Sequence, residues 1–162
     1  MKTVFTELIQ NSSTLFLKVI LIGLGAGVLA LTGLLLYAGI FGENLGPYRY
    51  ILFGICLTSI PFFIGLINAF KILIYIDRNQ AFSILSLNAL RRIKFCAIGI
   101  SALYLAGSPY IYWVAELDDA PGVILINLIL IAAPFAIAVF GEILIKLLRS
   151  AIEYKTENEL TV

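Results

Sequence analysis

The stretch VILIGLGAGVLALTGLLLYAGIF, residues 19–41, runs for 23 residues without a charged side chain. A helix needs about 20 apolar residues to cross the ~30 Å hydrocarbon core of a bilayer, so this stretch is long enough to span one. Three further uncharged runs follow at residues 50–70, 95–115 and 123–141. They raise the apolar content to 61% and leave only 13% charged residues, against ~45–50% and ~25% in soluble domains. The sequence therefore predicts four transmembrane segments.

The bilayer also decides the secondary structure of these runs. Backbone amides that find no water in lipid must bond within their own segment, and the runs lack the alternation of a barrel strand. The first run exceeds the ~7–15 apolar residues of a signal peptide, so we interpret it as a retained span. We expect an all-α integral membrane bundle of four transmembrane helices, forming one domain over residues 1–162 with a cytoplasmic tail at 142–162. The second and fourth helices should continue to Ile76 and Tyr154, because the sequence stays largely apolar there.

Basic residues lie almost entirely on one side of the predicted spans. Ten of the eleven Lys and Arg residues precede the first span, lie between the second and third, or follow the fourth. The two other connections hold only Arg49, beside acidic residues that include Glu116, Asp118 and Asp119. Because Lys and Arg resist translocation while acidic residues contribute little, we expect both termini in the cytoplasm and the chain in a bacterial cytoplasmic (inner) membrane.

The connection between the second and third runs carries a basic, patterned segment, IDRNQAFSILSLNALRRIKF at residues 76–95. Ser83 suits a helix N-cap, and Ile84, Leu87 and Leu90 share one face of the helix that would follow. We expect a short amphipathic helix at the inner interface, between the second and third spans. Two interpretations stay open: an anchor that only fixes topology, or a surface for a protein partner or anionic lipid. The candidate surface residues are Arg78, Phe82, Ser83, Asn88, Arg91, Arg92 and Lys94.

The segment DRNQAFSILSLNALRRI, the closing AIEYKTENELTV and the four-span layout together resemble the domain-of-unknown-function 2975 family of small bacterial membrane proteins. The family pattern falls on Phe82, Ser83, Asn88 and Ile93 in the inner loop. A glycine that often precedes the Phe-Ser pair in such proteins is replaced here by residues 79–81. The resemblance implies the four-span architecture. It implies no biochemical activity, since the family has none assigned.

Prolines inside three of the four predicted spans are candidate helix kinks: Pro61, Pro109 and Pro134. A proline within a helix removes one backbone hydrogen bond and bends the helix. Thr58, Ser59 and Ser108 lie beside two of them, Pro61 and Pro109, and are candidates to bond the freed carbonyls. The kinks either let the helices pack together or act as hinges around a central cavity. The dipeptide Pro-Phe, at residues 61–62 and 134–135, also suggests a parallel duplication of two hairpins.

Small and amide side chains in the spans are candidates for helix packing: Gly23, Gly27, Asn68 and Asn127. The two glycines form a G-x-x-x-G pair, which lets helix backbones approach closely, either within one chain or in a homodimer. Ala102 and Ala106 offer a similar pair in the third span. The two asparagines are expected to form hydrogen bonds between helices.

The sequence offers few residues for catalysis or metal binding. The chain has no histidine, which excludes a Ser-His-Asp triad, a Cys-His pair and a histidine metal site. Cys56 and Cys96 sit towards opposite faces of the predicted membrane, so both are expected to be free thiols. No ionisable residue lies deep in a span, and Glu142 at the inner end of the last one is expected to pair with Lys146 in solvent. We expect no catalytic residue, metal or cofactor.

Charged, patterned sequence is concentrated on the cytoplasmic side, and this favours a non-enzymatic accessory or signalling protein. It would present the inner loop and the C-terminal helix to a protein partner or to membrane lipid, with no direct contact to nucleic acid; a homo-oligomer is an alternative state. A second hypothesis is a small channel or carrier for a neutral or lipophilic solute, with Pro61, Pro134 or Asn127 at its cavity. A third is immunity-type protection against membrane-active peptides.

Overall fold

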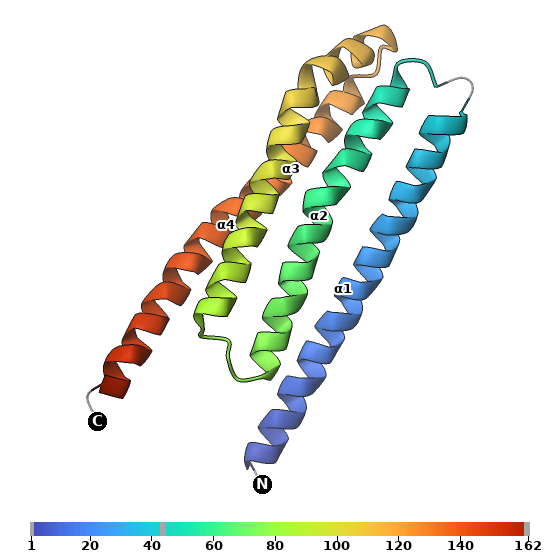
Figure 1. Cartoon of the computed structure of the whole chain (residues 1–162). Helices are drawn as coiled ribbons and strands as arrows, with labels where there is room; N and C mark the ends of the chain where they lie inside the picture. Colours follow the sequence, from blue (N-terminus) through green and yellow to red (C-terminus); the bar gives the residue numbers. More distant parts are fainter. Residues whose placement is uncertain (1, 43–44, 161–162) are drawn as a thin grey trace.

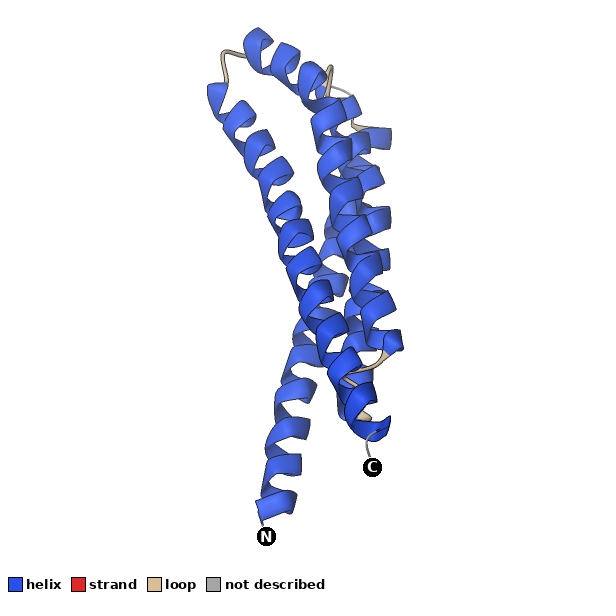
Figure 2. Ribbon diagram, turned by 90° about the vertical axis from the view of Figure 1, so that its left-hand side faces the viewer, coloured by secondary structure: helices blue, strands red, loops and turns tan. Residues whose placement is uncertain are grey.

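The structure is a computed structural model that describes residues 2–42 and 45–160. Every element within these residues is a helix, and short loops join them (Figure 2), which confirms the expected all-α architecture. The helices, in chain order, are α1 (Lys2–Phe41), α2 (Tyr48–Asp77), α3 (Ile84–Leu117) and α4 (Pro121–Leu160). Each of them contains one of the four uncharged runs of the sequence.

All four helices are longer than the runs that predicted them. At ~1.5 Å per residue, the 40 residues of α1 and of α4 extend over about 60 Å, twice the ~30 Å thickness of the hydrocarbon core. The predicted continuation of α2 to Ile76 and of α4 to Tyr154 is confirmed. All four helices are long and apolar enough to cross a membrane, over Thr14–Phe41, Tyr48–Asp77, Ile84–Leu117 and Pro121–Glu157.

The helices form an antiparallel row in which each packs against its neighbours in sequence (Figure 1). Among the described residues, no Cα atom of α1 lies within 8 Å of a Cα atom of α3 or α4. Both termini and the α2–α3 connection lie at one end of the row, here called the terminal end, and the two other connections lie at the opposite, loop end. Most large apolar side chains are exposed, as they are when lipid surrounds them. The small set of buried residues lies where neighbouring helices meet.

Two helices end in the same backbone motif. After α2, Asn79 takes a left-handed conformation with φ of 56° and its N donates to Ile76 O at 3.0 Å. The next amide, Gln80 N, donates to Tyr75 O at 2.8 Å. Asp119, with φ of 48°, ends α3 in the same way. These are Schellman motifs, and Asn and Asp are the non-glycine residues that best tolerate the left-handed region.

The expectation of a separate amphipathic inner helix is wrong, because α3 runs without interruption from Ile84 to Leu117. No glycine or proline occurs between residues 84 and 98, so the backbone has no reason to break before the span. The N-cap is where the sequence places it: Ser83 is extended, with φ of −133°, and its Oγ accepts a hydrogen bond from Ser86 N at 3.3 Å. The basic residues predicted for the inner helix therefore lie on the first turns of a membrane-spanning helix.

Candidate functional site

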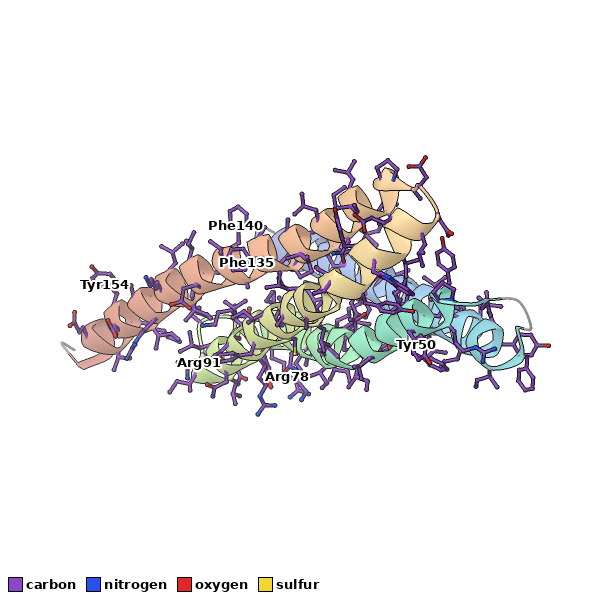
Figure 3. All side chains as sticks on the ribbon, turned by 90° about the horizontal axis from the view of Figure 1, so that it is seen from above. Tyr50, Arg78, Arg91, Phe135, Phe140 and Tyr154 are labelled. Carbon is purple, nitrogen blue, oxygen red and sulfur yellow. The ribbon has the colours of Figure 1, made fainter. Side chains whose placement is uncertain are left out.

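The predicted surface residues divide into an exposed set and a set that holds the fold together. Five of them are exposed at the terminal end and are called the basic face below: Arg78, Phe82, Asn88, Arg91 and Arg92. Figure 3 shows the side chains of Arg78 and Arg91 pointing away from the helices. Within the described part of the chain, no ion pair involves any of the three arginines. Their charges therefore face solvent or a partner.

Ser83 and Lys94 belong to the second set. Ser83 caps α3, as described above. Lys94 Nζ lies 2.9 Å from Glu142 Oε2, which ties α3 to α4 and leaves the lysine side chain 20% exposed. Glu142 was expected to pair with Lys146 on its own helix, and this ion pair across the interface replaces that expectation. Gly141 explains the choice: it is buried against Lys94, so the two backbones come close enough for the charges to meet.

A second ion pair ties α1 to α2 at the terminal end. Lys18 Nζ on α1 pairs with Asp77 Oδ2, at the last residue of α2. Both side chains are partly buried, with exposed fractions of 27% and 24%. Solvent and salt screen such a pair less than they screen an exposed one. Each of the two hairpins, α1–α2 and α3–α4, is thus closed by a lysine on its first helix and an acid on its second.

Two adjoining cavities lie among the helices. The larger one, here called the central cavity, has a volume of about 450 Å³ and is lined by all four helices. The smaller one, the loop-end cavity, has about 330 Å³ and is lined by α2, α3 and α4. Ile55, Thr58, Tyr104 and Leu130 line both, so the two spaces adjoin. None of the charged residues that the structure describes lines either cavity, and both volumes fall in the ~300–1,000 Å³ range of small-molecule pockets.

The candidate kinks differ in their relation to this space: Pro61 and Pro134 line the central cavity, whereas Pro109 is exposed. The expectation that neighbouring hydroxyls bond the freed carbonyls is wrong. Ser59 Oγ donates to Cys56 O at 2.6 Å, and not to Leu57 O, the carbonyl that Pro61 frees. The hydroxyls of Thr58 and Ser108 likewise bond carbonyls three and four residues before them. A hydroxyl on a helix bonds three or four residues back, so neither Thr58 nor Ser59 can reach Leu57 O. Ser108 could reach Leu105 O, which Pro109 frees, but it bonds Tyr104 O instead.

A chain of polar side chains borders the loop-end cavity. Asn127 Nδ2 on α4 donates to Ser108 Oγ on α3 at 2.8 Å, so the expected hydrogen bond between helices is present. Ser108 Oγ donates to Tyr104 O at 3.1 Å, and Tyr104 Oη lies 3.2 Å from Thr58 Oγ1 on α2. The sequence did not single out Tyr104. A tyrosine in the middle of a span, far from the membrane interfaces, is nevertheless a signal for a buried polar partner.

Asn68 behaves differently from Asn127. It is 4% exposed, and its Nδ2 donates to Ile64 O at 2.7 Å within its own helix. The hydrogen bond that the structure gives to Asn68 therefore does not cross to another helix, contrary to expectation. The two asparagines also lie towards opposite ends of the helices. Asn127 is near the start of α4, at the loop end, and Asn68 is in the second half of α2, nearer the terminal end.

The small residues that pack between helices are neighbours of those predicted. Gly23 and Gly27 are exposed, with open space where a Cβ would stand, so they do not form the α1–α2 contact. Gly25 between them is buried, and a Cβ there would meet Leu66 Cδ2 at 2.8 Å. The packing of this pair within the chain is therefore a wrong expectation, and its alternative role in a homodimer stays a prediction.

On α3, too, the buried residues are neighbours of the predicted ones. Ala102 and Ala106 are exposed, whereas Ala97 and Ser101 are buried. Ser101 Oγ donates to Ile131 O on α4 at 3.0 Å. The α3–α4 contact is thus made by the face of α3 that carries Ser101, the residue before Ala102, and not by the face of the predicted pair.

The thiols and acids do not assemble a reactive centre in the described part of the chain. Cys56 and Cys96 are free, as expected. Cys56 Sγ lies 3.8 Å from Thr32 O on α1. No group of three or more His, Cys, Asp or Glu side chains that could hold a metal ion occurs within residues 14–42 and 45–157, whose side chains the structure describes.

Residues 47–162, which include α2, α3 and α4, match the family model described as "Protein of unknown function (DUF2975)". The chain belongs to the DUF2975 family. This DUF2975 protein is 47% identical over 159 residues to the uncharacterized membrane protein YoaS of Bacillus subtilis (strain 168), a match that covers 94% of this chain and 99% of the relative. No solved structure matches it significantly. The relative and the four long apolar helices make the DUF2975 protein a multi-pass membrane protein with four predicted spans, and the resemblance seen in the inner loop is confirmed.

Proposed function

We propose that this DUF2975 protein is a non-enzymatic accessory or signalling protein of the bacterial cytoplasmic membrane, whose basic face binds an acidic surface of a cytoplasmic protein. One observation carries the proposal. Arg78, Arg91 and Arg92 are exposed at the terminal end without an ion pair in the described residues, while Lys18 and Lys94 at the same end are paired with acids of the fold. The fold thus pairs Lys18 and Lys94 with its own acids and leaves these three arginines exposed.

The distribution of charge supports a cytoplasmic terminal end. Ten of the eleven basic residues fall in segments at this end, and segments rich in Lys and Arg resist translocation. The eleventh basic residue, Arg49, lies at the loop end, where its Nη2 donates to Gly42 O at 2.9 Å. Anionic lipid headgroups compete for the basic face, since a Lys or Arg near such a surface gains ~1 kcal/mol. Lipid is therefore the alternative partner that an experiment must separate from protein.

Phe82 adds an exposed apolar side chain to the basic face. Its side chain is 60% exposed on the short segment between α2 and α3, next to a groove that Leu147 of α4 also lines. Aromatic residues and arginine are the types enriched at the energetic centres of protein interfaces. An exposed phenylalanine among arginines is consequently a better match to a protein surface than to lipid headgroups alone.

The test is photo-crosslinking in living cells. A photoreactive amino acid replaces Phe82, and a matched control carries it at Leu117, which is similarly exposed at the loop end. We expect a discrete protein adduct from position 82 that disappears when Arg91→Glu and Arg92→Glu are added, with no such adduct from position 117. Adducts with lipid only at position 82 would refute the protein partner and leave the basic face as a topology anchor.

A second candidate function, carriage of a neutral or lipophilic solute, is favoured by the adjoining cavities. All four helices line the central cavity, Pro61 and Pro134 lie in its wall, and every described residue that lines it is uncharged. Among the described residues, α1 and α4 do not pack against each other, so the row of helices does not close into a ring. In liposomes that contain the purified protein, solute flux that vanishes in a Pro61→Ala, Pro134→Ala variant would support carriage. Solute binding without any flux would refute it.

A further inference from the structure

The loop-end cavity contains a polar atom for which the fold provides no partner. Asn127 lines the cavity and is only 7% exposed. Its Nδ2 is held by Ser108 Oγ, but its Oδ1 is buried and finds no hydrogen-bond partner among the described residues. An unpaired buried amide oxygen is costly in an apolar environment, and native proteins leave few of them.

The orientation of this amide agrees with the hydrogen bonds around it. Ser108 has one hydroxyl proton and uses it on Tyr104 O at 3.1 Å, so its Oγ can only accept from Asn127. In the structure the amide nitrogen faces Ser108 Oγ, in agreement with this use of the hydroxyl proton. Oδ1 is the atom that remains, and it is an acceptor.

Tyr104 adds a second acceptor to the same space. Thr58 Oγ1 donates its proton to Ile55 O at 2.7 Å, so the 3.2 Å contact between Thr58 Oγ1 and Tyr104 Oη uses the proton of the tyrosine. Tyr104 Oη keeps a lone pair and has no proton left to give. Thr58 and Tyr104 both line the loop-end cavity. The protein therefore offers a ligand two oxygen acceptors, of which Asn127 Oδ1 is the unpaired one.

The rest of the cavity wall sets the character of the ligand. It is apolar and uncharged, and the rings of Tyr50 and Tyr110, 5.9 Å apart between centroids, border it. Among the described residues of the wall, a carboxylate or phosphate head would meet an amide oxygen and no cation, and an ammonium head would find no carboxylate. Gly54 and Gly107 also line the cavity and have open space where a Cβ would stand.

We propose that the loop-end cavity binds a neutral long-chain amphiphile whose hydroxyl head group donates a hydrogen bond to Asn127 Oδ1. Its alkyl chain would extend along the wall shared with the central cavity, at Ile55 and Leu130. This inference deepens the second candidate function by naming its ligand class. It rests on the binding step of that function alone, since a bound ligand need not cross the membrane.

The test uses the full chain in phosphatidylcholine nanodiscs and 1-dodecanol with a diazirine in its chain as the photoprobe. Mass spectrometry identifies the labelled residues. We expect saturable labelling of residues that line the two cavities. Unlabelled 1-dodecanol should compete about tenfold more strongly than its methyl ether or dodecanoic acid at equal concentration in the bilayer, the ratio expected of one hydrogen bond.

Three variants sharpen the result. Asn127→Leu should weaken binding of the alcohol about tenfold and abolish its advantage over the ether. Gly107→Leu places a side chain in the open space of the cavity and should block labelling, whereas Gly23→Leu, the same change at an exposed position on α1, should not.

Three outcomes would overturn the inference: labelling that does not saturate, labelling spread over all lipid-facing helices, or equal competition by alcohol and ether. The last would mean that water serves Asn127. If Asn127→Leu does not fold, the comparison of alcohol with ether on the unaltered chain decides alone. Binding without flux would leave this inference standing and refute only carriage.

Discussion

Replacing Ser101 by leucine should force α3 and α4 apart, whereas the same replacement at Ala102 should leave the protein intact. Ser101 is 7% exposed, and its Oγ donates to Ile131 O on α4 at 3.0 Å. Ala102, the next residue, is exposed. Consecutive residues of a helix point about 100° apart, so this pair of variants reports which face of α3 meets α4.

The magnitude follows from two effects. Forcing extra methylene groups into a packed interface costs ~1–3 kcal/mol, and losing a hydrogen bond between membrane helices costs ~0.6 kcal/mol on average. We therefore expect Ser101→Leu to lower the free energy of unfolding by about 2–4 kcal/mol, and Ser101→Ala to lower it by about 0.6 kcal/mol. Ala102→Leu should change it by less than about 0.5 kcal/mol.

The assay is reversible unfolding of the full chain in mixed micelles with a rising mole fraction of SDS, followed by the fluorescence of Trp113, the single tryptophan. Equal destabilisation by Ala102→Leu and Ser101→Leu would refute the assigned interface. If Ser101→Ala were as damaging as Ser101→Leu, the hydrogen bond and not the close fit would hold the two helices together.

Three further predictions concern the terminal end and the topology. Lys94→Glu alone should lower the melting temperature in detergent, and adding Glu142→Lys should restore much of it; failure of the double variant to recover would count against the ion pair. Ser83→Ala should cost about 1 kcal/mol of unfolding free energy, and Ser83→Asp should retain most of it, because only the latter keeps an acceptor at the N-cap; equal loss in both variants would argue against capping. In a cysteine-free background, a membrane-impermeant maleimide applied to intact cells should label Asp119→Cys and not Gln80→Cys, and the reverse pattern would invert the proposed topology.

The helices themselves were predictable because the bilayer imposes a one-dimensional rule. A run of ~20 uncharged residues must be helical wherever it crosses lipid, so the four runs predict the four helices directly. The N-cap at Ser83 was also readable, since capping depends on one side chain and the backbone beside it. The continuity of α3 was missed because a polar, amphipathic first section resembles an interfacial helix. Only the absence of a glycine or proline from residues 84–98 argued otherwise.

The faces that pack were much harder to predict, because the spans are apolar on every side. In a water-soluble helix the polar residues mark the exposed face, but here lipid accepts apolar side chains as readily as a neighbouring helix does. The G-x-x-x-G rule thus selected Gly23 and Gly27, while the fold uses Gly25. The pairing of Lys94 with Glu142 was likewise out of reach, since it joins residues on different helices and depends on how closely α3 approaches Gly141.

The two hairpins resemble each other in charge placement, but their registers differ. Each has a lysine on its first helix paired with an acid on its second. A parallel duplication would set both acids at the same distance after the recurring Pro-Phe pair. Asp77 lies sixteen residues after Pro61, whereas Glu142 lies eight after Pro134. Eight residues correspond to about 12 Å along a helix, so the acids do not occupy equivalent positions. A partly buried lysine needs an acidic partner wherever it occurs. This requirement accounts for both ion pairs without a duplicated hairpin.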